Sequence, residues 1–255
     1  MANTGALAHT DEPFKDWAHS PQFPATNPTR LTYEKTVWHR ASELALIQSE
    51  PKYSALQIPD IPLLPHGLAR GTITEIIGPR SSGRTASFLH ILAQATRRGE
   101  ICAVVDVHNS FHPASAFSAG VLLNHVVWVR CGGRLEHAIR SVDLILHAGG
   151  FGMVVLDFCE TSPRLLNRIP LSYWFRFRRA IENTPTILLF LGEVNQVKSC
   201  SSNILSLKMK APDWHGKPGF RLLHGAEIAM NLRKPVGHTG QTHSVKVFDP
   251  GVRVG

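Results

Sequence analysis

Cysteine and long apolar runs are both scarce in this sequence. The four cysteines, Cys102, Cys131, Cys159 and Cys200, form no Cys-x-x-Cys pair, which argues against a disulfide framework or a zinc ribbon. Most of them lie in or beside apolar runs, so we expect buried, reduced thiols. No run approaches the ~20 apolar residues that a membrane helix needs. The first residues also lack the basic start and apolar core of a signal peptide, so we expect a cytoplasmic protein without membrane contact.

Acidic residues are fewer than basic ones, 19 against 27, which gives a net charge of +8. An excess of positive charge suits a polyanionic partner such as nucleic acid, and it is equally consistent with charge that only keeps a protein in solution. A content of 43% apolar and 18% charged residues argues against a disordered chain. The 14 histidines show no tight ligand spacing, so we expect no metal site.

Strand-like and helix-like stretches alternate after Gly67. Apolar runs typical of strands buried on both faces lie at 72–77, 101–105, 126–129, 153–156 and 186–191. Apolar residues recur at helical spacing between them, most clearly at 135–146, before Gly149-Gly150. This alternation predicts an α/β fold with a mostly parallel, twisted sheet flanked by helices.

The two ends of the chain have a different composition. After residue 195, the stretches 203–208, 220–223, 226–232 and 244–248 are predicted as antiparallel edge strands. Residues 63–255 are the predicted core domain. Residues 1–62 are predicted to hold a Pro-rich tail, a short amphipathic helix at 32–49 and an extended linker. The apolar face of this helix would pack on its own core or on another subunit or protein; it is formed by Val37, Trp38, Ala41 and Leu44.

A phosphate-binding loop is predicted between the first strand and the following helix. The segment Gly78-Pro79-Arg80-Ser81-Ser82-Gly83-Arg84-Thr85 has the spacing Gly-x4-Gly-x-Thr of a P-loop, with Arg84 in place of the usual lysine. Backbone N–H groups of such a loop face phosphate oxygens, and the threonine hydroxyl holds Mg²⁺. The predicted nucleotide-binding residues are Gly78, Ser81, Ser82, Gly83, Arg84, Thr85 and Asp157.

Two of these residues admit alternative roles. Asp157 ends an apolar strand, where an acidic residue would hold the metal through water. The guanidinium of Arg84 is wider and planar, so it could instead fill the site and pair with Asp157. An ATPase also needs a carboxylate that orients the attacking water, yet the segment from Asp106 to Pro113 contains no Glu. Asp106 would either take that role or only cap the turn that follows it.

Basic residues gather in two regions. Arg176, Arg178 and Arg179 alternate with aromatic residues, as in surfaces that hold a nucleic-acid backbone and stack on bases. The favoured alternative is a solvated basic face opposite core residues, predicted to be Leu171, Trp174, Phe175 and Ile181. The second region is predicted to contact DNA or a protein, or to be a solvated loop; it holds Lys198, Lys208, Lys210 and Lys217.

The order and spacing of these motifs, from about residue 63 to 195, resemble the core of bacterial RecA recombinases. The likeness rests on Gly67-Leu68-Ala69-Arg70-Gly71, on residues 75–85 and on the segment 106–113. Within that superfamily, Trp128-Val129-Arg130-Cys131-Gly132, Leu156-Asp157 and residues 169–176 resemble the ImuA proteins. That resemblance implies a bacterial, nucleoid-associated accessory factor of damage-induced translesion synthesis. It would act beside an ImuB-type polymerase homologue, with other translesion or RecA proteins and single-stranded DNA as further partners.

The chain departs from the RecA pattern at three positions. RecA would have Lys at Arg84, a catalytic Glu at His108, and an Asn-Gln pair near Gly192-Glu193. The resemblance with these departures, Asp106 included, implies a catalytically degenerate scaffold with no catalytic residue, in which ATP and Mg²⁺ can bind without hydrolysis. The alternative is an active or weakly active ATP- and DNA-dependent RecA paralogue, in which Arg84 and Asp106 replace the missing groups.

Overall fold

The computed structural model describes residues 52–59, 61, 63–217 and 219–234, and the backbone of residues 242–248. The chain separates into two compact units, Met1–Ser49 and Glu50–Gly255, and every described residue belongs to the second. The helix predicted at 32–49, with Val37, Trp38, Ala41 and Leu44, therefore lies outside the described residues.

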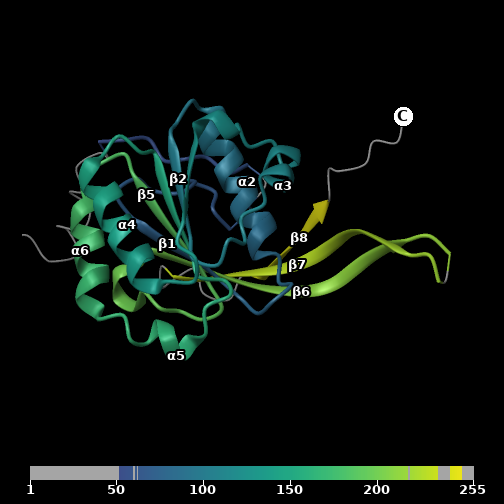
Figure 1. Ribbon diagram of the computed structural model, residues 1–255. Helices are drawn as coiled ribbons and strands as arrows, with labels where there is room; N and C mark the ends of the chain where they lie inside the picture. The colour runs from purple at the N-terminus through teal and green to yellow at the C-terminus, as the bar shows by residue number, and fades with distance from the viewer. Residues whose placement is uncertain (1–51, 60, 62, 218, 235–241, 249–255) are drawn as a thin grey trace, which may run out of the picture. The chain divides into compact units, whose positions relative to one another are not determined.

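The second unit is built on an eight-stranded sheet in the order β3-β2-β4-β5-β1-β6-β7-β8 (Figure 1). The five strands at the β3 end are β1 (Ile73–Ile77), β2 (Cys102–Asp106), β3 (Val126–Arg130), β4 (Met153–Asp157) and β5 (Ile187–Gly192). They run parallel, and β6 continues this direction beside β1. Every residue of β1, β2, β4 and β5 is buried, which explains their continuous apolar runs. The predicted α/β fold is confirmed.

The C-terminal strands are longer than the sequence pattern indicated. β6 (Asn203–His215) pairs in parallel with β1 and antiparallel with β7 (Leu222–Lys234), which pairs antiparallel with β8 (Thr242–Phe248). The stretches 220–223 and 226–232, expected as separate strands, both contribute to β7. β-bulges in the β6–β7 ladder interrupt the alternation of side chains along the two strands. The alternating sequence pattern is therefore interrupted at positions where the strands themselves continue.

Helices cover both faces of the sheet (Figure 1). α2 (Arg84–Arg97) and α3 (Pro113–Ser118) pack on one face, in a core that includes Ile76, Val104 and Leu189. α4 (Leu135–Ala148) and α6 (Leu171–Ile181) pack on the other face, against the strand residues of opposite orientation. The short α5 (Pro163–Leu166) precedes α6. None of the helices in the described part is long and apolar enough to cross a membrane.

The buried face of α6 differs from the prediction. Trp174, Phe177 and Ile181 are fully buried, whereas Leu171 and Phe175 are 40% and 49% exposed. Trp174 contacts Phe177 and Phe190 edge to face, and these aromatic contacts fix the helix rotation. The expected core role of Leu171 and Phe175 was therefore wrong: Trp174 packs on Phe190 of β5 and on Phe177, and this rotation leaves Leu171 and Phe175 partly exposed.

Part of the segment expected as a linker packs on the same core as α2. Leu56, Ile58 and Ile61 are buried there, and Leu56 and Leu68 exchange backbone hydrogen bonds of 2.9 and 2.8 Å. All four cysteines are buried and free, as predicted. Burial, together with the charge of Glu100, raises the pKa of Cys102 to about 12, so this thiol stays protonated at neutral pH.

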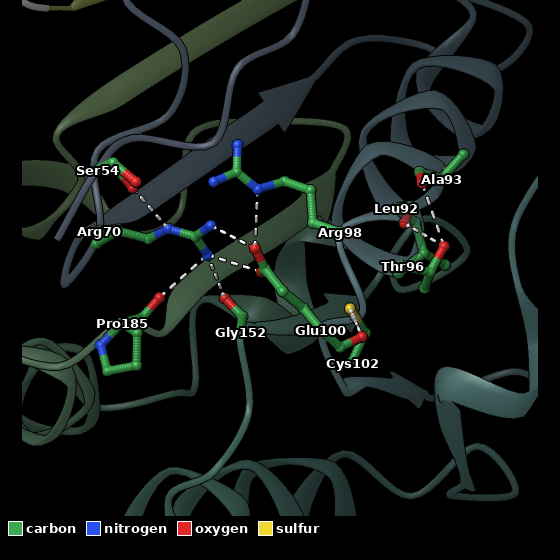
Figure 2. A network of polar contacts seen from close by, with 10 residues as sticks. All are labelled: Ser54, Arg70, Leu92, Ala93, Thr96, Arg98, Glu100, Cys102, Gly152 and Pro185. Atoms are coloured by element: carbon green, nitrogen blue, oxygen red, sulfur yellow. Dashed lines mark hydrogen bonds and ion pairs between the residues drawn. The ribbon is translucent and has the colours of Figure 1, made fainter.

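Arg70 joins the loops that lead into four strands, at the end of β1 opposite the phosphate-binding loop (Figure 2). Its guanidinium forms two hydrogen bonds with the Glu100 carboxylate, of 2.8 and 2.6 Å. It also donates to the carbonyl oxygens of Ser54, Gly152 and Pro185, each at 3.2 Å. Since Glu100, Gly152 and Pro185 precede β2, β4 and β5, this one side chain holds the amino ends of the central strands together.

Candidate functional site

The loop 78–83 connects β1 to α2 at the carboxyl ends of the parallel strands. Gly83, the N-cap of α2, has a φ of 89°, and a Cβ there would lie 1.9 Å from Cδ1 of Ile228 on β7. Only glycine therefore fits both the backbone and the packing at this position. The first turn of α2 presents free N–H groups beside the loop, as predicted for a P-loop.

Two polar side chains of the loop are buried without a partner. Nη1 of Arg84 and Oγ of Ser82 have no hydrogen-bond partner among the described residues, and Arg84 is only 6% exposed. A buried polar atom without a partner is costly, and the oxygens of a phosphate would supply acceptors for both of these atoms. The residues present therefore fit the phosphate of a nucleotide.

Arg84 forms no ion pair with Asp157 within the described part of the chain. The carboxylate of Asp157 accepts hydrogen bonds from the Ser110 hydroxyl and the Cys159 N–H, both at 2.8 Å. Of the two roles that the sequence left open for Arg84, the ion pair with Asp157 is therefore not formed, and loop residues hold this carboxylate instead. Burial and the charge of Asp157 raise the pKa of Cys159 well above its usual range, and the charge of Arg84 opposes them.

A cavity of about 1300 Å³ opens beside the loop. The loop, α2 and Asp157 line it on one side, and Met209 and Ile228 of the β6–β7 pair line it on another. Thr85 is exposed, and both Thr85 and Asp157, the two residues predicted to hold a metal ion, line this cavity. The other carboxylate among the described lining residues is Glu160, which pairs with Arg80. All the predicted nucleotide-binding residues except Gly78 line this cavity, and Gly78 lies just before them at the end of β1.

Asp106 is fully buried, and both oxygens of its carboxylate accept hydrogen bonds. Oδ1 accepts from the backbone N–H groups of His108 and Ser110, at 3.2 and 3.0 Å, and from the Ser110 hydroxyl at 3.3 Å. Oδ2 accepts from the Phe111 N–H at 2.9 Å and from the Trp128 indole at 3.1 Å. Of the two roles left open by the sequence, the structure places Asp106 as the cap of the turn at 108–111.

The other two positions that depart from the RecA pattern, His108 and Glu193, are not among the described residues that line the cavity. Nε2 of His108 is 2.9 Å from the hydroxyl of Thr161. Glu193 follows β5 directly and is half-buried, and it does not contribute to the described cavity lining. Ser110 and Thr161 were missed by the sequence reasoning. Their partners are 47 and 53 residues away in the chain, so no local spacing could have indicated them.

The predicted basic residues do not form one surface. Arg178 and Arg179 are exposed on α6, and the short 3-10 helix η3 (Lys198–Cys200), which carries Lys198, packs against α6. Lys208 and Lys210 lie on β6, which Figure 1 shows on the side of the unit away from α6. Two of these cations are already paired, because Arg176 contacts Asp143 and Lys210 contacts Glu227.

Residues 51–164 match the sequence family described as the RecA N-terminal domain. Over 98 residues, or 38% of this chain, the sequence is 35% identical to Protein RecA of Rickettsia massiliae (strain Mtu5) and 39% identical to Protein RecA of Rhodospirillum rubrum. These matches cover 28% and 26% of the two relatives, so the chain spans little more than a quarter of their length.

A solved structure described as the RadB recombinase shares the fold. It matches with a TM-score of 0.55 and 18% identity, and the alignment covers 74% of this chain and 93% of the other. The phosphate-binding loop at the carboxyl edge of the sheet lies within the matched segment 51–164. The chain is thus similar in sequence to the RecA N-terminal domain over residues 51–164, and its fold is similar to that of the RadB recombinase.

Proposed function

We propose that this protein is a catalytically degenerate RecA-like accessory protein of the ImuA type, which acts in damage-induced translesion DNA synthesis. Its phosphate-binding loop would hold a nucleotide without hydrolysing it. The RecA-shaped surface would then dock an ImuB-type polymerase homologue and other translesion or RecA proteins.

The observation that best supports this proposal is the set of hydrogen bonds around Asp106. A residue that orients an attacking water needs a free acceptor directed at the nucleotide, and both oxygens of Asp106 are occupied by the turn 108–111 and Trp128. His108, at the position of the RecA glutamate, contacts the hydroxyl of Thr161. These contacts favour a site that retains phosphate recognition and has lost the water-activating carboxylate.

The unpartnered groups of the loop support retention of binding. Arg84 and Ser82 each keep a buried polar atom without a hydrogen-bond partner in the described protein, and a bound anion would compensate for the cost of burying these atoms. If bound, Mg²⁺ would add charge neutralisation between Thr85 and Asp157, while the loop N–H groups and Arg84 orient the phosphates. This arrangement binds and positions phosphate.

Nucleotide turnover tests the proposal directly. ATP binding is measured by calorimetry, and phosphate release is followed with and without single-stranded DNA, for the wild type, Asp157→Ala and Arg84→Ala. We expect ATP binding by the wild type that is weakened in Arg84→Ala, with no phosphate release above background. Turnover by the wild type that disappears in Asp157→Ala would overturn the scaffold role and establish the active RecA paralogue.

The translesion role needs a separate test with the named partner. The tagged protein is recovered from bacteria with and without DNA damage, and the ImuB-type polymerase homologue is detected with a specific antibody. We expect damage-dependent recovery of that homologue, and its absence from both samples would count against the ImuA assignment.

Direct DNA contact is tested with the charge-reversal pair Arg178→Glu and Arg179→Glu. Both residues are exposed and lie beside Lys198, so their reversal should weaken retardation of single-stranded DNA and flatten its salt dependence. Arg176→Glu is a weaker perturbation because Asp143 already pairs with Arg176. Equal retardation by the double variant and the wild type would exclude α6 as a DNA contact.

A further inference from the structure

Three potential metal ligands meet on the outer part of the β6–β7 pair. Asp213 and His215 belong to β6 and His224 to β7, and one ligand atom of each lies within 4.8 Å of the others. Nδ1 of His224 is 3.7 Å from Oδ2 of Asp213. The two imidazole rings have centroids 4.4 Å apart, in an edge-to-face arrangement.

The strand geometry explains why these residues converge. Asp213 and His215 are two residues apart, so they share one face of β6. In the β6–β7 ladder Asp213 pairs with Gly225 and Trp214 pairs with Leu223, so His224 is the extra residue of a β-bulge. A bulge redirects the side chain of the extra residue, which here brings His224 to the other two.

We propose that Asp213, His215 and His224 form a binding site for a divalent transition-metal ion of the zinc class. Two imidazoles and one carboxylate are ligands typical of zinc, and three protein ligands leave a fourth position for water or for a donor from a partner. All three residues are exposed, so an ion reaches them without unfolding the strands. The sequence analysis predicted no metal site because His224 is brought to the pair at 213 and 215 only by the strand pairing.

The site would fasten the outer end of the hairpin. Figure 1 shows β6 and β7 running together beyond the helices to a turn. That outer region carries large apolar side chains in contact with solvent, including Phe220 at 86% and Leu222 at 77% exposed. An ion bound to both strands next to this turn would hold the two strands in register, because each strand supplies at least one ligand.

Zinc titration of the full-length, untagged protein tests the proposal. The variants are His215→Ala and His224→Ala, with His147→Ala as the matched control. His147 is also exposed and lies 3.5 Å from a carboxylate, Asp143, but it is not part of the described three-ligand cluster. We expect one Zn²⁺ per chain in the wild type and in His147→Ala, with at least about tenfold weaker binding in the two ligand variants.

Cobalt and hydrogen exchange provide independent readouts. Co²⁺ should give the intense visible absorption of a four-coordinate site, which is lost in His224→Ala and weakened in Asp213→Asn. Zn²⁺ should slow amide exchange in residues 208–230 of the wild type and leave that of His224→Ala unchanged. Unchanged zinc affinity in both histidine variants, or no stoichiometric binding by the wild type, would overturn the proposal. Nucleotide binding is measured on the same samples, so failure of this site is distinguishable from failure of the phosphate-binding loop.

Discussion

Arg70 and Arg84 are two buried arginines near opposite ends of β1, and their surroundings differ. The side chain of Arg70 is 7% exposed, and its guanidinium contacts one carboxylate and three carbonyl oxygens. Arg84 is 6% exposed, and its Nη1 has no partner among the described residues. Burial alone therefore does not distinguish a structural arginine from a binding one.

The surroundings of the two arginines differ because Arg70 lies at the amino ends of the strands and Arg84 at their carboxyl ends. At the amino ends, carbonyl groups and Glu100 converge on Arg70 and compensate its desolvation. At the carboxyl ends, the loop and the start of α2 present N–H groups, which cannot accept from Arg84 and instead favour an anion. The same residue type thus joins the strands at their amino ends, and in the proposed function it binds phosphate at their carboxyl ends.

The largest effect is expected for Arg70→Ala. Its removal takes two hydrogen bonds from the half-buried carboxylate of Glu100 and one from each of three carbonyl oxygens, so the free energy of unfolding should fall by about 3 kcal/mol. Arg98→Ala is the control, because Arg98 is 44% exposed and only 3.5 Å from the same carboxylate, and it should cost under about 1 kcal/mol. Urea unfolding followed by circular dichroism measures both, and similar losses in the two variants would remove the assigned role of Arg70.

Arg84→Gln should change the stability of the protein little and weaken its binding of ATP strongly. Because Nη1 of Arg84 lacks a partner in the described protein, the free energy of unfolding should change by less than about 1 kcal/mol. Affinity for ATP should fall at least about tenfold, corresponding to one charge-assisted hydrogen bond. Arg80→Gln is the control, since Arg80 is 72% exposed in the same loop. A stability loss equal to that of Arg70→Ala, with ATP binding intact, would abolish the contrast between the two arginines.

The smallest effect is expected for Glu75, whose carboxylate has one oxygen that accepts hydrogen bonds and one that is buried without a partner in the described protein. Its Oε2 accepts from the N–H groups of Gln196 and Val197, while Oε1 is buried without a partner in the described protein. Burial raises the pKa of Glu75 above its usual 4.5, although those two hydrogen bonds lower it. The folded state then binds the proton more tightly than the unfolded state, so stability should fall as the pH rises from 4.5 through the raised pKa.

Glu75→Gln does not titrate, so this fall should be absent from its profile. Thermal unfolding of the wild type and the variant at matched pH values measures the difference. A wild-type stability that rises relative to the variant over that range would show that the hydrogen bonds outweigh burial.

Local pattern predicted most of the core. The runs at 72–77, 153–156 and 186–191 correspond to β1, β4 and β5, because strands buried on both faces need continuous apolar residues. The spacing of Gly78, Gly83 and Thr85 likewise predicted the loop between β1 and α2. Long-range contacts were harder to predict: the rotation of α6 depends on Phe190, and the partners of Asp106 include Trp128 on the neighbouring strand.

The sequence by itself determined the α/β alternation, the glycine-containing loop between β1 and α2, and the presence of Arg84 where the P-loop pattern has lysine, since these depend on residues adjacent in the chain. Only the tertiary structure decided which charged groups are satisfied. Strand register brings Ser110 to Asp157 and gathers the carbonyls around Arg70, and a β-bulge brings His224 to Asp213. Hydrogen bonds and coordination depend on distances of a few ångströms between residues far apart in the chain, which only the folded sheet sets.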